Sequence, residues 1–375
     1  VFFAIKGEKK DGNAFIKNAF DKGASIAIVN RYHRNVNKKK QLKVLDSLKC
    51  ITSLSKKIRE NFHGKLIAIT GSCGKTSLKQ MIGESVNKFS KTNFSPKSYN
   101  NKYGVPLSLF NINLDYKNSV FEIGMDKKGE IDFLSRMLMP DIGVITNVSY
   151  AHAKNFKNIN QIAEAKGEII QNIKKNGIIV LNKDDKFYQL HKKMANERCL
   201  NVVSFGLKNK GNIFLKSIKK ERNKFIINVK IYRDEKVFYI KNINKNNLYN
   251  ILASIGVIFS IGFIKNLKPF LFYKFLTPDG RGDISKIKFN NKIFYLIDES
   301  YNSNPMSMKS AISNFDLINV KKNKKHFLMG DMLELGKFSR KLHINLSKHI
   351  NSSSIDKFHV YGRFVKETYK KIKKI

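Results

Sequence analysis

The sequence predicts an α/β protein whose central domain is a mostly parallel sheet with helices on both faces. Two observations lead to this prediction: apolar, strand-like runs alternate with segments of helical spacing from residue 65 onward, and a glycine-rich turn joins the first such run to a helix. At 375 residues the chain is also too long for one ordinary core. We therefore predict three domains, covering residues 1–62, 63–281 and 282–375.

The first 62 residues predict a small α/β domain. Val1–Gly7 and Ser25–Val29 are apolar, strand-like runs, and Asp11–Lys22 between them has helical spacing. A second helix is predicted over Leu45–Asn61, and the boundary is placed at His63-Gly64. The chain begins without a methionine and directly on a strand-like run, so we expect that residues are missing before it.

The central segment shows the clearest alternation of strands and helices. Ile213–Ile240 contains short β runs and predicts an antiparallel appendage. The other predicted strands are Leu66–Thr70, Val120–Gly124, Ile142–Asn147 and Gly177–Leu181, and the helices are Thr76 to about Phe89, Ile159–Lys174 and Asn246–Ile261.

A second α/β pattern follows Thr277–Gly282 and predicts a Rossmann-like third domain. Its strands are expected at Phe294–Ile297 and His326–Met329, and helices are expected after Pro305 and Ser339. No strand follows its last helical stretch, so we expect that residues are missing at this end as well.

The charge of the chain is strongly positive, because 71 basic residues stand against 29 acidic ones and give +42. Such an imbalance often indicates a nucleic-acid or anionic membrane partner. Here the lysines are spread from end to end rather than clustered, which indicates a compositional bias, so we predict no nucleic-acid partner. Three widely spaced cysteines fit a reducing compartment. No apolar run approaches the roughly 20 residues of a membrane helix, so we expect a cytoplasmic protein without membrane insertion.

The turn Gly71–Thr76 has the features of a phosphate-binding loop. It leaves a buried strand and opens a helix, which places backbone N–H groups and a helix N-terminus against an anion. Lys75 would neutralise phosphate charge, and the Thr76 hydroxyl can ligate magnesium. The usual pattern requires glycine where this chain has Ile69, so the loop is a shortened variant. We predict that ATP is bound by Gly71, Ser72, Cys73, Gly74, Lys75, Thr76 and Ser77.

Glu122 is a candidate metal ligand, since it lies near the end of an apolar strand. An ionised carboxylate is costly there unless it is paired or bound to a metal. The carboxyl end of a parallel strand favours magnesium ligation, while a salt bridge to one of the many lysines stays as the alternative. His152 alone is a weak signal, and Glu164–Glu168 has the spacing of an exposed helix face with local charge pairs.

Motifs along essentially the whole chain resemble those of the Mur ligase family. Within the family the resemblance is strongest to members that join D-alanyl-D-alanine to UDP-N-acetylmuramoyl-tripeptide. The matching stretches are Phe2–Gly7 with Asp11-Gly12, Thr70–Thr76, Asn100-Asn101 with Gly104–Pro106, Glu122–Gly124, Gly129–Ile131, Thr146-Asn147 with Ala151-His152, Ala165–Glu168, Asn182 with Asp184-Asp185, Asn247 with Asn250, Asp298–Pro305 and Gly330–Gly336. The last two are the most specific to this subgroup.

The resemblance implies the fold, the cofactors and several residue roles. It implies the three-domain Mur ligase architecture, ATP, two magnesium ions and a monomeric assembly. Thr76 and Glu122 resemble the ligands of one magnesium ion, and Glu122, His152 and a carbamylated Lys166 those of the second. The implied catalytic residues are Lys75, Lys166, His152 and Arg281. The resemblance also implies that Asn250 contacts the adenine, Arg281 the γ-phosphate and Asp298 the ribose. The implied substrate contacts are Asn100, Asn101, Asn147, Tyr301, Asn302 and Asn304.

Three positions depart from the family pattern. The family's histidine ahead of the Asn247 helix is Asn246 here, its Gly-Asn pair is Lys97-Ser98, and its paired aspartates are Asp298-Glu299. The alternatives are a sister Mur ligase or folylpolyglutamate-type ligase, a nucleotide-binding fragment without activity, and a basic phosphate-loop protein that binds nucleic acid.

Overall fold

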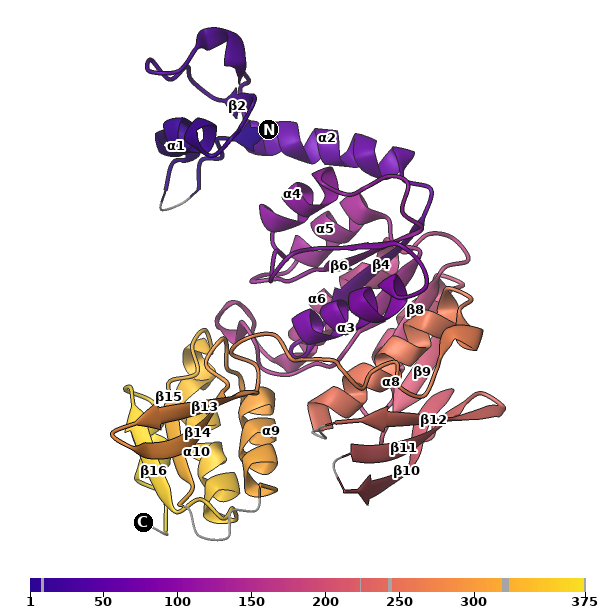
Figure 1. Ribbon diagram of the computed structural model, residues 1–375, viewed down its shortest axis with the longest axis vertical. Coiled ribbons are helices and arrows are strands. Elements are labelled where there is room, and N and C mark those ends of the chain that lie inside the picture. The colour runs from indigo at the N-terminus through magenta and orange to yellow at the C-terminus, as the bar shows by residue number, and fades with distance from the viewer. Residues whose placement is uncertain (8–9, 223, 242–244, 319–323, 374–375) are drawn as a thin grey trace.

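The computed structural model describes residues 1–7, 10–222, 224–241, 245–318 and 324–373. Figure 1 shows an elongated arrangement, with the N-terminal unit at one end, the large sheet in the middle and the C-terminal unit at the other end. Among the described residues, no helix is long and apolar enough to cross a membrane.

The N-terminal unit is a three-stranded parallel sheet covered by short helices. Its strands are β1 (Phe2–Phe3), β2 (Ala27–Val29) and β3 (Gln41–Lys43), in that order. The strand expected over Val1–Gly7 is therefore shorter than predicted, because its pairing with β2 ends at Phe3. A 3₁₀ turn and α1 (Ile16–Asp21) occupy the predicted helical segment.

Helix α2 (Ser47–Asn61) joins this unit to the large sheet. Asp46 caps its first turn by accepting hydrogen bonds from two backbone N–H groups. Near its other end the buried Arg59 guanidinium donates to the carbonyls of Leu138 and Met139, at 2.6 and 2.9 Å, and lies 3.3 Å from the Asp141 carboxylate. The Arg59 side chain thus connects α2 to the segment that leads into the strand β7 (Ile142–Ile145) of the large sheet.

The large sheet has nine strands in the order β12-β11-β10-β9-β8-β7-β4-β6-β5. Neighbouring strands from β10 to β5 are parallel, and β11 and β12 form the antiparallel appendage that the sequence predicts. The bounds are β4 (Lys65–Thr70), β5 (Thr92–Phe94), β6 (Asn118–Glu122), β7 (Ile142–Ile145), β8 (Ile178–Asn182), β9 (Asn201–Gly206), β10 (Ile213–Glu221), β11 (Lys224–Ile231) and β12 (Asp234–Ile240).

Helices cover both faces of this sheet, which confirms the predicted fold class. Successive side chains of β4 point to opposite faces, so Leu66 and Ala68 pack with one set of helices and Ile67 and Ile69 with the other. The first set is α4 (Gly104–Phe110), α5 (Glu130–Leu138), α6 (Ile159–Gln171) and α7 (Tyr188–Glu197), and the second is α3 (Lys75–Asn87) and α8 (Lys245–Ser260).

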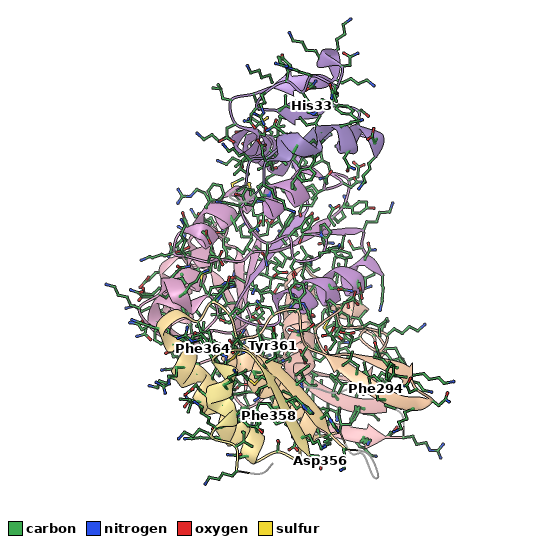
Figure 2. All side chains as sticks on the ribbon, turned by 90° about the vertical axis from the view of Figure 1, so that its left-hand side faces the viewer. His33, Phe294, Asp356, Phe358, Tyr361 and Phe364 are labelled. Atoms are coloured by element: carbon green, nitrogen blue, oxygen red, sulfur yellow. The ribbon has the colours of Figure 1, made fainter. Side chains whose placement is uncertain are left out.

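The C-terminal unit contains two separate pairs of strands. β13 (Asp283–Phe289) and β14 (Lys292–Asp298) form an antiparallel hairpin, whereas β15 (His326–Gly330) and β16 (Lys357–Tyr361) are parallel. Figure 2 shows Phe358 and Tyr361 on β16 and Phe294 on β14. The helices are α9 (Pro305–Asp316), α10 (Ser339–Asn351) and α11 (Val365–Tyr369). Both predicted strands exist, but among the described residues β14 pairs with β13 rather than joining β15.

Candidate nucleotide and metal site

A cavity of about 1030 Å³ lies at the carboxyl end of β4 and β6, where the central and C-terminal units meet. It brings together residues that are far apart in the sequence. Of the predicted site residues, those that line it are Ser72, Cys73, Gly74, Lys75, Thr76, Ser77, Asn100, Asn101, Glu122, His152, Asn250, Arg281, Tyr301, Asn302 and Asn304. Gly71, Asn147, Lys166 and Asp298 lie outside that lining, and Asn147 borders a small neighbouring pocket instead.

The phosphate loop packs against the residues that directly follow strand β7. Gly71 has a φ of +147°, and a Cβ atom there would lie 1.9 Å from the Thr146 hydroxyl, so only glycine fits. The Thr146 hydroxyl donates to the Cys73 carbonyl at 2.7 Å, and the Cys73 N–H donates to the Asn147 side chain at 2.9 Å. Asn147 therefore supports the loop from the neighbouring strand end.

Thr76 and Glu122 form a buried set of oxygen atoms beside this loop. The Thr76 hydroxyl donates to one oxygen of Glu122 and the Asn100 amide to the other, both at 2.7 Å. Glu122 is only 1% exposed, and among the described residues its hydrogen-bond donors are these two neutral groups rather than a cation. A hydroxyl and a carboxylate in contact are the oxygen ligands that magnesium prefers, so this pair fits the ion.

Lys75 and Lys166 bring two buried amino groups to the same region. The Lys75 ammonium donates to the Gly71 carbonyl at 2.8 Å; burial lowers its pKa, and the nearby Glu122 carboxylate opposes that shift. Lys166 lies on α6 and is 2% exposed, so the exposed face expected from the spacing of Glu164–Glu168 is wrong for this residue. Burial lowers the pKa of Lys166 well below its ordinary value, and the charge of Lys75 lowers it further.

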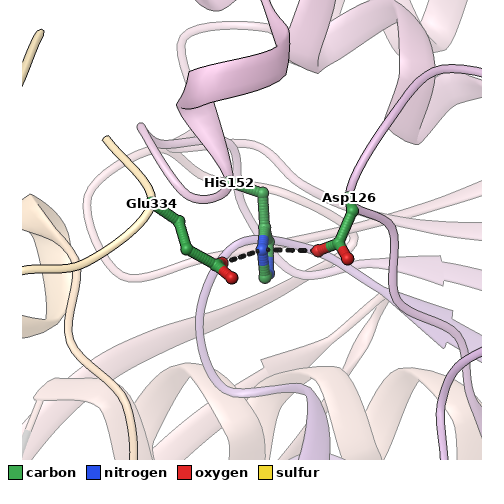
Figure 3. A group of neighbouring side chains, drawn as sticks. All are labelled: Asp126, His152 and Glu334. Atoms are coloured by element: carbon green, nitrogen blue, oxygen red, sulfur yellow. Dashed lines mark ion pairs between the residues drawn. The ribbon is translucent and has the colours of Figure 1, made fainter. Parts of the chain in front are cut away.

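His152 lies at the rim of the cavity between two carboxylates. Figure 3 shows its ring between Asp126 and Glu334, with Glu334 coming from the C-terminal unit. The His152 Nδ1 atom is 2.9 Å from an Asp126 oxygen and also contacts Glu334 Oε2. Burial lowers the pKa of the imidazole, and the two carboxylates oppose this shift. Asp126 and Glu334 are site residues that the sequence analysis missed, although Glu334 lies within the motif Gly330–Gly336.

Arg281 reaches the phosphate loop through a serine that we also missed. Its guanidinium donates to the Ser98 hydroxyl at 3.2 Å, and that hydroxyl lies 3.2 Å from the Thr76 hydroxyl. The guanidinium carbon is 4.2 Å from the centre of the Tyr301 ring, a cation–π contact. Lys97, which replaces a family glycine, has a φ of +42°, the left-handed conformation that favours glycine.

The nucleotide contacts implied by the resemblance lie at different places around the loop. The Asn250 amide oxygen would be 3.0 Å from a Cβ at Gly74, so Asn250 touches the loop directly. Asp298 accepts a hydrogen bond from the Ser300 N–H at 2.8 Å, and its neighbour Glu299 lines the cavity. The ribose role of Asp298 stays a prediction.

A strand, a glycine turn and a helix arranged in this way around Lys75 and Thr76 define a nucleotide-binding protein of the phosphate-loop class. Residues 69–258 match the family model described as the Mur ligase middle domain. The chain belongs to the Mur ligase family.

Named relatives and solved structures of similar proteins cover nearly all of the chain. It is 32% identical to the UDP-N-acetylmuramoyl-tripeptide--D-alanyl-D-alanine ligase of Rickettsia prowazekii, over 98% of this chain and 81% of that protein. The same ligase of Bacillus subtilis is 29% identical, over 97% of this chain and 77% of that protein. The chain is similar to the solved structure of MurF from Acinetobacter baumannii, with a TM-score of 0.85 and 27% identity, over 100% of this chain and 80% of that chain. It is also similar to MurF ligase from Thermotoga maritima in complex with ADP, with a TM-score of 0.82 and 28% identity, over 100% of this chain and 83% of that chain.

Proposed function

We propose that this chain is an ATP-dependent ligase that joins the terminal carboxylate of UDP-N-acetylmuramoyl-tripeptide to the amine of D-alanyl-D-alanine, in peptidoglycan precursor synthesis. The names of the full-length relatives support this substrate pair. The main structural support is that Lys75, Glu122 and Arg281, from three separate segments, border one cavity at the phosphate loop. We also propose the boundaries 1–62, 63–281 and 282–375 for the three domains.

The reaction is proposed to proceed through an acyl phosphate. The substrate carboxylate attacks the γ-phosphorus of ATP and ADP leaves; the dipeptide amine then attacks the acyl carbon, loses a proton, and inorganic phosphate leaves. We propose that Lys75 and Arg281 neutralise the transferring phosphoryl charge, and their position on one cavity supports this role. The contact of Arg281 with Tyr301 and Ser98 orients the guanidinium at the junction between the units. Closure of the C-terminal unit over the loop would exclude water during these steps.

Magnesium would supply further neutralisation of charge on the phosphates. We propose that Thr76 and Glu122 hold one ion and that Glu122, His152 and a carbamate of Lys166 hold a second. Burial lowers the pKa of Lys166 well below its ordinary value and so favours the free amine, which is the form that adds carbon dioxide. Chains equilibrated with ¹³C-bicarbonate should give a carbamate carbon signal by NMR that a Lys166→Met variant lacks. Absence of that signal from the original chain would remove the carbamate from the proposal.

The remaining roles are those that the family resemblance implies. We propose that Asn250, Arg281 and Asp298 contact the adenine, the γ-phosphate and the ribose of ATP. We further propose a monomer in the cytoplasm that interacts with neither nucleic acid nor the membrane interior. The proposed substrate contacts are Asn100, Asn101, Asn147, Tyr301, Asn302 and Asn304.

The direct test is release of ADP by the purified chain. ATP, magnesium and the UDP-linked tripeptide are supplied with D-alanyl-D-alanine or with single amino acids as acceptors, and the product is identified by mass spectrometry. We expect ADP and a pentapeptide product with the dipeptide alone. A single amino acid serving as the better acceptor would indicate a sister ligase. ATP binding without ADP release under any condition would indicate an inactive nucleotide-binding chain.

A further inference from the structure

We propose that Glu334 is a positioning residue, which fixes the orientation and the tautomer of the His152 ring from across the boundary between the C-terminal unit and the central sheet. The inference rests on the proposed function, in which His152 is a metal ligand. It adds a residue of the C-terminal unit that lies outside the lining of the cavity.

The contacts of the ring determine which nitrogen is available. Both carboxylates, Glu334 and Asp126, meet Nδ1 of His152. Neither approach has the direction of a hydrogen bond, but both bring negative oxygen atoms beside Nδ1. A lone pair on Nδ1 would be repelled by these oxygens, so of the two neutral tautomers they favour the one with hydrogen on Nδ1 and the lone pair on Nε2. Histidines that bind metals commonly have a carboxylate beside their other ring N–H. The ring itself lines the cavity, whereas Glu334 stands outside the lining.

Glu334 is brought to the ring by a packed interface. Its carbonyl accepts a hydrogen bond from the Lys154 N–H at 2.9 Å, and Glu334 itself has a φ of +62°. Two residues later Gly336 has a φ of +54°, and a Cβ there would lie 2.8 Å from the Lys154 Cα. The loop therefore lies directly against the turn that follows His152.

Apolar contacts on both sides of Glu334 fix this docking further. Met332 and Leu335 are each 1% exposed and belong to the same buried cluster as Ala153 on the central unit. The rings of Tyr150 and Phe338 are 5.0 Å apart between their centres. Because Met332 and Leu335 are buried in this way, the Glu334 carboxylate is presented to His152 only when the C-terminal unit is docked.

The test measures manganese binding, because Mn²⁺ substitutes for magnesium and its free form is counted directly by electron paramagnetic resonance. The full chain is titrated in the presence of a non-hydrolysable ATP analogue. The variants are Glu334→Leu, Glu334→Gln, the double variant Asp126→Leu with Glu334→Leu, and His152→Ala. Glu197→Leu, which alters an exposed glutamate on α7, is the matched control.

We expect Glu334→Leu to raise the dissociation constant of the weaker manganese site by about 10- to 100-fold, the usual cost of losing a carboxylate behind a metal-binding histidine. Glu334→Gln, which keeps an acceptor oxygen, should cost less; the double variant should cost most, and Glu197→Leu should change nothing. If the double variant binds manganese as the original chain does while His152→Ala binds it weakly, the role of Glu334 is overturned and the proposed function stands. If His152→Ala has no effect, the proposed metal role of His152 fails first.

A second measurement is independent of metal and of activity. Long-range ¹H–¹⁵N spectra of the imidazole rings, with His152 assigned by its variant, report which nitrogen carries the hydrogen. We expect Nδ1–H in the original chain, a smaller preference for Nδ1–H in Glu334→Leu, where Asp126 still faces Nδ1, and a mixture of tautomers in the double variant. Hydrogen on Nε2 in the original chain would overturn the inference, even if Glu334→Leu proves too unstable to titrate.

Discussion

The amide nitrogen of Asn304 lies 3.0 Å from the sulfur of Cys73, so the first helix of the C-terminal unit touches the middle of the phosphate loop. The same amide lies 3.4 Å from the Ser72 carbonyl, and the side chain is 7% exposed. Asn304 also caps α9, because its side-chain oxygen accepts from the N–H groups of Met306 and Ser307. One residue therefore both starts a helix and fixes that helix to the loop.

These two roles of Asn304 can be separated by substitution. Asn304→Ala removes the cap and the loop contact, and should destabilise the C-terminal unit by about 1 kcal/mol. Asn304→Asp keeps a capping oxygen but loses the N–H donor that faces Ser72 and Cys73. The midpoint temperature of thermal unfolding should therefore fall for Asn304→Ala alone, whereas the affinity for ATP should fall for both variants. Equal unfolding temperatures for the two variants would contradict the capping role.

Lys75 should be essential for chemistry and dispensable for folding. Lys75→Met removes the ammonium beside the loop and should lower the rate of ADP release by at least about 100-fold, the scale of losing one preorganised charge. The control is Lys65→Met, at the exposed start of β4, the strand that precedes the loop, and it should retain full activity. Initial rates at saturating ATP measure the difference. A Lys75→Met rate within tenfold of the original would show that the loop does not hold the reacting phosphates.

Glu122 should determine the dependence on magnesium. Glu122→Gln removes the charge but can still hydrogen-bond to Thr76 and Asn100, so the fold should persist. We expect the half-saturating magnesium concentration for ADP release to rise by at least about 10-fold. The exposed Glu164 on α6 offers the control Glu164→Gln. An unchanged magnesium titration would instead favour a purely structural role for the Glu122 carboxylate.

Arg59 should matter for stability and not for chemistry. Arg59→Met leaves the Leu138 and Met139 carbonyls without this donor and removes one of two cations beside Asp141, the other being Lys174. Two buried acceptors left unsatisfied cost roughly 3 kcal/mol together, and lysine cannot replace the forked guanidinium. Urea unfolding followed by circular dichroism measures this effect, with the exposed neighbour substituted in Lys56→Met as the control. Equal unfolding midpoints for both variants would contradict the connecting role of Arg59.

The buried strands of the large sheet could be predicted from the sequence because they are continuous apolar runs. Ile142–Asn147, for example, contains β7, whose four residues are all buried. The short edge strand β5 was not predicted, since Thr92–Phe94 has little apolar character and only one buried residue. The strand at Phe294 was predicted without its partner, because an apolar run does not specify whether its neighbour is a hairpin or a crossover strand.

The site residues that could be predicted from the residue pattern are those at the ends of predicted strands. The phosphate loop and Glu122 stand at strand ends, and both border the cavity. The burial of Lys166 could not be predicted from its spacing, because it depends on the neighbouring helix and strands. Glu334 and Asp126 could not be assigned to His152 either, because their meeting depends on how the C-terminal unit docks.

The fit of Gly71 against Thr146 has an evolutionary consequence. Because the Thr146 hydroxyl occupies the volume that any side chain at position 71 would need, the glycine cannot be replaced alone. A homologue with alanine at the glycine position would require a smaller residue opposite it and would lose the hydroxyl that holds the Cys73 carbonyl. Any replacement of the glycine should therefore be accompanied by a change at the threonine position.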